Sequence, residues 1–220
     1  MVSVLWVLLL SLCISVSFEG SQAHGGLREA LQKAASFPDD PVAQAELARA
    51  YNLNGEPGKA ASSARQAVAL CPGFPPAILE LAHASRLTEA HGVAVRLYET
   101  YLSTAPRSLE ALVGNSESLA RMERWDESFS SAIAAIREAP KNADGYGALG
   151  RAYRIAGRFE EGVEVLRQGL AFSRDSARML YDLGFCYAEM GNRTSALEQY
   201  EKLLELDRKA ASLLFRMIYP

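Results

Sequence analysis

The histidines are the first residues that could carry chemistry, because imidazole is the commonest general base and metal ligand near neutral pH. The chain has three, His24, His83 and His91. His83 and His91 are eight residues apart, with no Asp or Glu at ligand spacing on the same helix face. His24 would follow a new N-terminus after cleavage at Ala23, but nothing supplies further ligands for a metal there. We therefore expect no metal site and no cofactor.

The other residues that can carry chemistry also lack a suitable setting. Cys13, Cys71 and Cys186 have neither metal-ligand spacing nor the pattern of a disulfide framework. Residues 145–150 read G-x-G-x-x-G, but no strand precedes them, as a dinucleotide-binding loop requires. No serine or cysteine sits in a nucleophile elbow, and no carboxylate pair is marked by an apolar pocket. We expect no catalytic residue, so the protein is predicted not to be an enzyme.

Composition excludes further classes. The chain has 23 basic and 26 acidic residues, interspersed rather than clustered, and a net charge of -3. Nucleic-acid binding needs clustered Lys and Arg, so no nucleic-acid partner is expected. With 220 residues, 49% of them hydrophobic, the chain can bury a sizeable core.

The N-terminus resembles an export signal. Residues 1–18 carry no charged side chain, and Val4 to Val16 is almost entirely apolar. Small residues follow that suit cleavage after Ser17 or Ala23, so residues 1–23 are predicted to be a signal peptide. No Lys or Arg precedes the apolar run, which leaves a membrane anchor formed by residues 1–18 as the alternative. We expect export to the periplasm, the extracellular space or a secretory lumen.

An internal repeat of 34 residues organises the rest of the chain. Pro38, Pro72, Pro106 and Pro140 share this spacing. Two series of small residues and one of aliphatic residues keep the same phase: Ala48, Ala82, Ser116, Gly150 and Gly184; Ala60, Ala94, Ser128, Gly162 and Ala196; Val68, Leu102, Ile136, Leu170 and Leu204. Three series in one phase indicate a repeat architecture.

Each 34-residue unit is predicted to form two helices. In the fifth, apolar residues recur at helical spacing over 177–190, Gly191 ends that helix, and a second helix is predicted over about 194–206. Small residues at fixed positions allow two antiparallel helices to approach closely, and a large side chain there would overpack the contact.

These motifs resemble the tetratricopeptide repeat. The resemblance is carried by Leu47-Ala48, Tyr51, Gly55, Ala60; by Leu149-Gly150, Tyr153, Gly157, Gly162; and by Leu183-Gly184, Tyr187, Gly191, Ala196, Tyr200. It implies an all-α, right-handed α-solenoid. The predicted domains are a partial N-terminal unit or capping helix at 24–40, five units at 41–74, 75–108, 109–142, 143–176 and 177–210, and a truncated helix at 211–220. The third unit departs most from the pattern of the tetratricopeptide repeat, because Asn115 and Glu123 stand at positions that usually hold leucine and glycine.

The resemblance implies a binding groove lined by the first helix of each unit, with a protein or peptide segment as the partner. The side of these helices away from the core holds the candidate residues Arg49, Asn52, His83, Arg86, Arg121, Arg151, Arg154, Tyr181 and Phe185. Arginine can bind a carboxylate with two hydrogen bonds, and aromatic rings supply anchoring area. The alternative is a solvated helix face, since Glu80 and Glu110 share it.

The C-terminal end suggests a second kind of interface. Leu214, Met217 and Ile218 fall on the core positions of a sixth first helix, beyond which no partner helix follows. Solenoids normally close with a polar-faced cap. The alternative function is therefore self-assembly into a homo-oligomer through these three residues, whereas the favoured one is a non-enzymatic scaffold that binds a partner in the groove. A membrane contact is expected only through an uncleaved N-terminal segment.

Overall fold

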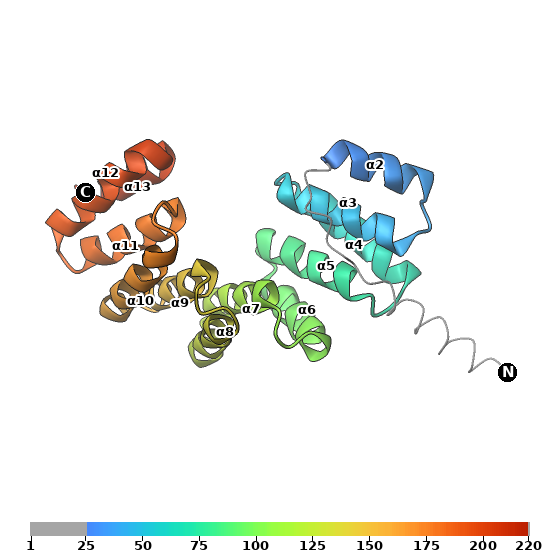
Figure 1. Cartoon of the computed structure of the whole chain (residues 1–220), viewed down its shortest axis with the longest axis horizontal. Coiled ribbons are helices and arrows are strands. Elements are labelled where there is room, and N and C mark those ends of the chain that lie inside the picture. The colour runs from blue at the N-terminus through green and yellow to red at the C-terminus, as the bar shows by residue number, and fades with distance from the viewer. Residues whose placement is uncertain (1–25, 220) are drawn as a thin grey trace. The chain divides into compact units, whose positions relative to one another are not determined.

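The structure is a computed structural model that describes residues 26–219. The regular elements in this range are all α-helices (Figure 1): α2 (Leu27–Ser36), α3 (Pro41–Leu53), α4 (Pro57–Leu70), α5 (Pro75–Leu87), α6 (His91–Thr104), α7 (Leu109–Arg121), α8 (Trp125–Glu138), α9 (Ala143–Ile155), α10 (Phe159–Phe172), α11 (Ala177–Glu189), α12 (Arg193–Leu206) and α13 (Arg208–Ile218). The export signal or anchor and His24 lie outside the described residues. Among residues 26–219, no helix is both long enough and apolar enough to cross a lipid bilayer.

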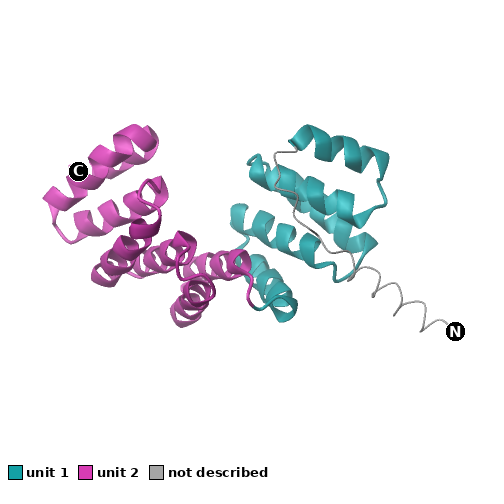
Figure 2. Ribbon diagram, in the orientation of Figure 1, with its two compact units in different colours: residues 1–106 teal, residues 107–220 magenta. Residues whose placement is uncertain are grey.

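The chain divides into two compact units, the first ending at Pro106 and the second beginning at Arg107 (Figure 2). Unit 1 holds α2 to α6 and unit 2 holds α7 to α13. Within each unit every helix packs on the next one along the chain. The first helices also contact one another: α3 with α5 in unit 1, and α7 with α9, α9 with α11, and α11 with α13 in unit 2. Each unit therefore contains a layer of first helices, which we call the first-helix layer.

The small-residue series explains how the paired helices approach. Gly150 on α9 lies against α10, where an added Cβ would come within 2.4 Å of Leu166 Cγ. Gly162 on α10 is confined less severely, since its Cβ would lie 3.2 Å from Cys186 Sγ. Ala48, at the same repeat position as Gly150, is fully buried. Only a small side chain fits at these helix contacts, as the sequence predicted.

The turn between the two helices of each 34-residue repeat requires a left-handed backbone. Gly55, Gly157 and Gly191 adopt φ values of 74°, 73° and 74° there. Glu89 and Glu123 occupy the same repeat position and are forced to φ values of 61° and 59°. A side chain with a Cβ is strained in this region by roughly 1–2 kcal/mol, so the second and third repeats carry a local cost that the others avoid.

Replacing Glu123 with glycine is therefore expected to stabilise the protein by about 0.5–1 kcal/mol, the relief of strain being partly offset by the greater freedom of glycine in the unfolded chain. The midpoint of urea unfolding should rise. Glu123→Ala is the control, because alanine keeps the Cβ and the strain. An equal gain from alanine would show that removal of the charge, rather than the backbone conformation, is responsible.

The third repeat also has a polar interior. Ser116 Oγ and Ser128 Oγ are 3.2 Å apart, and Ser131 donates to the carbonyl oxygen of Leu112 at 3.0 Å. Asn115, at the position where leucine is usual, is buried, and its Oδ1 accepts no hydrogen bond from any residue in the described range. Hydroxyl groups bonded to the backbone thus replace part of the apolar contact that the other repeats have.

The C-terminal helix differs from the sequence expectation. The repeat register places its start at residue 211, but Asp207 accepts hydrogen bonds from the backbone N–H groups of Lys209 and Ala210, so α13 begins at Arg208. Leu214 and Ile218 are 0% and 2% exposed, in a cluster with residues of α11 and α12.

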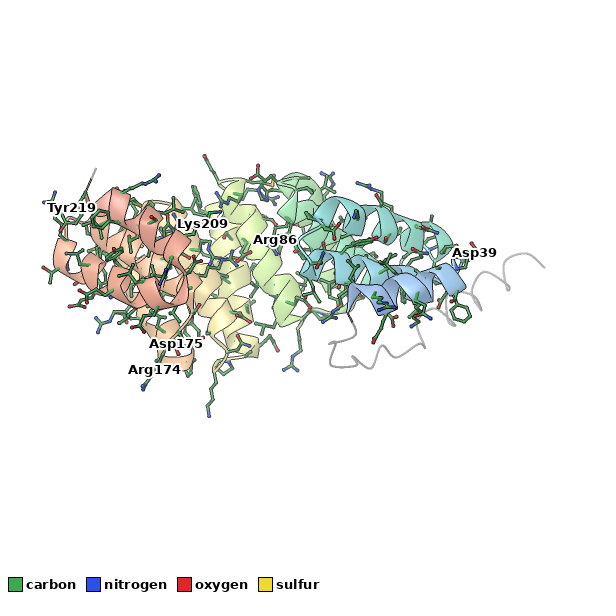
Figure 3. All side chains as sticks on the ribbon, turned by 90° about the horizontal axis from the view of Figure 1, so that it is seen from above. Asp39, Arg86, Arg174, Asp175, Lys209 and Tyr219 are labelled. Atoms are coloured by element: carbon green, nitrogen blue, oxygen red, sulfur yellow. The ribbon has the colours of Figure 1, made fainter. Side chains whose placement is uncertain are left out.

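The outward side of α13 is mixed, because Lys209, Ser212 and Arg216 are exposed and so are the apolar side chains of Leu213 and Phe215. Lys209 and Tyr219 mark the two ends of this segment in Figure 3. Leu214 also fills the space left by Gly184, whose added Cβ would lie 2.4 Å from Leu214 Cδ2. Leu214 and Ile218 therefore belong to the core of unit 2 and not to an exposed assembly surface, while Met217 is partly exposed. The helix packs on α11 and α12.

Candidate functional site

The predicted groove residues all lie on first helices. In unit 1, Arg49 and Asn52 are on α3, and His83 and Arg86 are on α5. In unit 2, α7 carries Arg121, α9 carries Arg151 and Arg154, and α11 carries Tyr181 and Phe185.

In unit 1 two of these side chains, Asn52 and His83, lie around a buried carboxylate. Glu80 on α5 is 5% exposed and accepts a hydrogen bond from Asn52 Nδ2 at 2.9 Å. His83 Nδ1 lies 3.9 Å from the same carboxylate, and its ring centroid is 5.6 Å from that of Tyr98. Arg86 Nε donates to the Tyr98 hydroxyl at 3.4 Å. Asn52 and His83 thus help to join α3, α5 and α6, and Glu80 does not lie on a solvated face.

In unit 2 five charged side chains from three first helices form a continuous network. Arg151 on α9 donates from Nη1 to Glu117 Oε1 on α7, and its Nε lies 3.0 Å from Asp182 Oδ2 on α11. Arg154 Nε lies 2.7 Å from Asp182 Oδ1, and Arg178 Nη2 lies 2.8 Å from Glu117 Oε1. The network links α7, α9 and α11 across the first-helix layer.

The inner members of this network are buried. The side chains of Arg151 and Glu117 are each 9% exposed, and that of Asp182 is 3% exposed. Charges at such depth persist only when they are paired, because removal from water costs several kcal/mol per ion. Arg151 was predicted to bind a partner, but its guanidinium forms ion pairs with Glu117 and Asp182 of its own unit.

One member of this network, Arg154, and two aromatic rings next to it remain partly exposed. The guanidinium carbon of Arg154 is 4.6 Å from the centroid of the Phe185 ring, a cation–π contact. The ring of Tyr181 is 6.4 Å from that of Phe185, centroid to centroid. We call Arg154, Tyr181 and Phe185 the Arg154 patch. Arg121 on α7 is exposed and also lies on a first helix of unit 2.

Asp182, Glu117 and Arg178 complete the network and were not among the predicted site residues. A signal for two of the contacts is present in the sequence. Asn52 and Glu80 are separated by 28 residues, and so are Arg154 and Asp182. A repeat places residues of equal separation in equivalent geometry, so the recurring pairing of a donor with an acid could have been read from the register.

Cys186 on α11 lies close to the network, but its chemistry is suppressed. The thiol is free and buried. Burial, reinforced by the nearby negative charge of Asp182, raises its pKa to about 12. The nucleophilic form of cysteine is the thiolate, so at neutral pH this group acts as a small apolar core residue. Among residues 26–219, no three or more His, Cys, Asp or Glu side chains are grouped to hold a metal.

Comparison with known proteins agrees with this architecture. Three family models, each described as tetratricopeptide repeat, match residues 154–214, 41–84 and 113–177, together more than half of the chain. A thermophilic TPR protein of Thermus thermophilus, TTC0263, is 23% identical with a TM-score of 0.70, over 80% of this chain and 96% of that one. YrrB, described as a TPR protein with an unusual peptide-binding site, is 16% identical with a TM-score of 0.56, over 85% of this chain and 97% of that one.

A curated relative matches a shorter stretch. The human DnaJ homolog subfamily C member 7 is 27% identical over 107 residues, 49% of this chain, and its mouse counterpart is 26% identical over the same length. The chain spans only 22% of the length of these relatives. The structural likenesses show the fold, and the repeat models match the stretches in which the 34-residue register was found. The chain therefore belongs to the tetratricopeptide repeat family.

Proposed function

We propose that this protein is a non-enzymatic scaffold that binds a segment of a partner protein against the first-helix layer of unit 2. Proteins with this repeat fold generally mediate protein–protein interactions. The observation that supports this location is the Arg154 patch, where one arginine and two aromatic rings lie together and partly exposed. Arg and Tyr are enriched among the residues that dominate binding energy at interfaces.

The buried charge network makes this layer a suitable platform. Because Arg151 joins α7 to α11 through Glu117 and Asp182, the helices that carry the patch are held at a fixed spacing. A rigid surface loses little conformational freedom when it binds, so more of the contact energy appears as affinity. The peptide-binding site named for YrrB, which has the same fold, is consistent with a peptide ligand here.

To test the proposal, peptides are selected from a random library displayed against the full chain, and their affinities are measured by fluorescence anisotropy. The double substitution Tyr181→Ala and Phe185→Ala is expected to weaken binding by about 30-fold or more, the effect of removing an interface hot spot. Phe172→Ala is the matched control, because Phe172 is an exposed ring on the second helix α10. Failure to select any peptide, or equal affinities for wild type and the double variant, would contradict the proposal.

We further propose that the protein is exported by cleavage of residues 1–23 and acts outside the cytoplasm. The uncharged apolar stretch from Val4 to Val16, followed by small residues, supports this. N-terminal sequencing of the purified protein is expected to begin after Ser17 or Ala23. An intact Met1 on membrane-bound protein would establish the alternative, an anchor formed by residues 1–18.

A further inference from the structure

We infer that Arg154 is a receptor for a carboxylate carried by the partner, so that the segment bound by unit 2 contains an acidic side chain next to an apolar one. This inference rests on the proposed function and adds the chemistry of the partner. Arg154 is in an unusual state, because its Nε is buried yet donates no hydrogen bond to any residue that the structure describes. Asp182 Oδ1 is 2.7 Å away, but the N–H bond does not point along the contact.

Two arginines share the carboxylate of Asp182, each at a different oxygen. Arg151 Nε lies 3.0 Å from Asp182 Oδ2, and Arg151 also has Glu117 as a second carboxylate partner. For Arg154, Asp182 is the one ion-pair partner among the described residues. A guanidinium has five N–H donors, and buried donors in native proteins are nearly always hydrogen-bonded to protein or water. The guanidinium of Arg154 donates no hydrogen bond to a described residue, and the part of the side chain that remains exposed, 15%, can present its Nη donors to a ligand.

The surroundings of Arg154 select a carboxylate with an apolar neighbour. The Phe185 ring covers one face of the guanidinium at 4.6 Å and shields it from water, which strengthens an ion pair formed at the remaining edge. A carboxylate can accept two parallel hydrogen bonds from such an edge. The rings of Phe185 and Tyr181 offer apolar area directly beside it.

The depth of the guanidinium indicates how the carboxylate is presented. The Arg154 side chain is 15% exposed, so the acid must reach below the surface. A Glu or Asp side chain can do this while the partner backbone passes over the aromatic rings. A C-terminal carboxylate would have to bring the backbone itself down to the guanidinium. We therefore assign the carboxylate to a side chain within an extended segment.

The test uses two pools of N-acetylated, C-amidated random peptides that differ only at a fixed centre, Glu-Leu in one and Gln-Leu in the other. Wild-type protein is expected to bind the Glu pool about tenfold more tightly or better, the factor expected for a hydrogen-bonded charge pair. Arg154→Gln should abolish this preference, and Arg154→Lys should retain only part of it, because lysine cannot form the paired hydrogen bonds. Arg167→Gln, which removes an exposed arginine on α10, should leave the preference intact.

Circular dichroism on each variant shows whether it is folded, and the comparison of pools on wild-type protein does not depend on any variant. A third pool, with the Gln centre and a free C-terminus, measures binding through a chain terminus. Equal binding of the Glu and Gln pools, or a preference that persists in Arg154→Gln, would overturn the inference. The proposed function would survive that outcome if both pools lose affinity for the variant that carries Tyr181→Ala and Phe185→Ala. In that case only the inference about Arg154 would be wrong. Tighter binding of the third pool than of the Glu pool would overturn the assignment to a side chain.

Discussion

Replacing Arg151 with glutamate is expected to lower the free energy of unfolding by about 3–5 kcal/mol, the cost of breaking a buried ion pair by removing one partner. In the wild type this guanidinium separates two carboxylates, Glu117 on α7 and Asp182 on α11, each less than 10% exposed. Glutamate at this position would place a third negative charge between them with no water to screen the repulsion. Unit 2 should lose the ion pairs through which Arg151 links α7, α9 and α11.

The measurement is urea unfolding followed by far-ultraviolet circular dichroism, which reports the loss of helix. Arg167→Glu makes the same charge change on an exposed position of α10 and should alter stability by less than about 0.5 kcal/mol. Arg151→Met should fall between the two, because it removes the bridge without adding a charge. An unfolding curve for Arg151→Glu that matches wild type would mean that Arg151 is not part of the core and is free to contact a partner.

The repeat architecture could be predicted from the sequence because it repeats. A helix contact that tolerates only a small side chain recurs once in each 34-residue repeat, so Ala48, Gly150 and their equivalents appear at constant spacing. The first helices begin at residues 41, 75, 109, 143 and 177, in step with that spacing. Periodic packing thus leaves a trace that one sequence is enough to reveal.

The roles of the two groove arginines could not be separated in the same way. Arg151 and Arg154 lie on the same side of α9, three residues apart, and have the same side chain. What distinguishes them is their partners: Arg151 lies between carboxylates on two neighbouring helices, whereas Arg154 has one carboxylate and an aromatic ring. These partners come from other repeats of the chain, so the periodicity of α9 alone does not identify them.

The C-terminal helix shows the limit of extending a register. Continuing the 34-residue spacing placed the helix start at residue 211, but Asp207 caps a helix that begins at Arg208. A local signal, an aspartate that can accept from the next backbone N–H groups, was present in the sequence and outweighed the repeat. The core positions Leu214 and Ile218 were identified correctly, and the helix packs them against α11 and α12.

Gly150→Leu is expected to destabilise the protein by about 3 kcal/mol, the upper end for overpacking a close helix contact. Even the first added atom, Cβ, would lie 2.4 Å from Leu166 Cγ and 2.6 Å from Leu166 Cδ2. Leu166 is fully buried, so a change of χ1 that moved its Cγ away would drive the side chain into other core residues. Helices α9 and α10 would have to move apart, and the charge network on α9 would be displaced with them.

The matched control is Gly58→Leu, which introduces the same side chain near the start of α4, where an added Cβ meets nothing within 4 Å. Leucine has a higher helix propensity than glycine, so this substitution should stabilise by up to about 1 kcal/mol. The two variants thus have opposite expected signs in the midpoint of urea unfolding. If Gly150→Leu also raises the midpoint, propensity outweighs packing at this contact, and the recurring small residues do not owe their positions to the close approach of the helices.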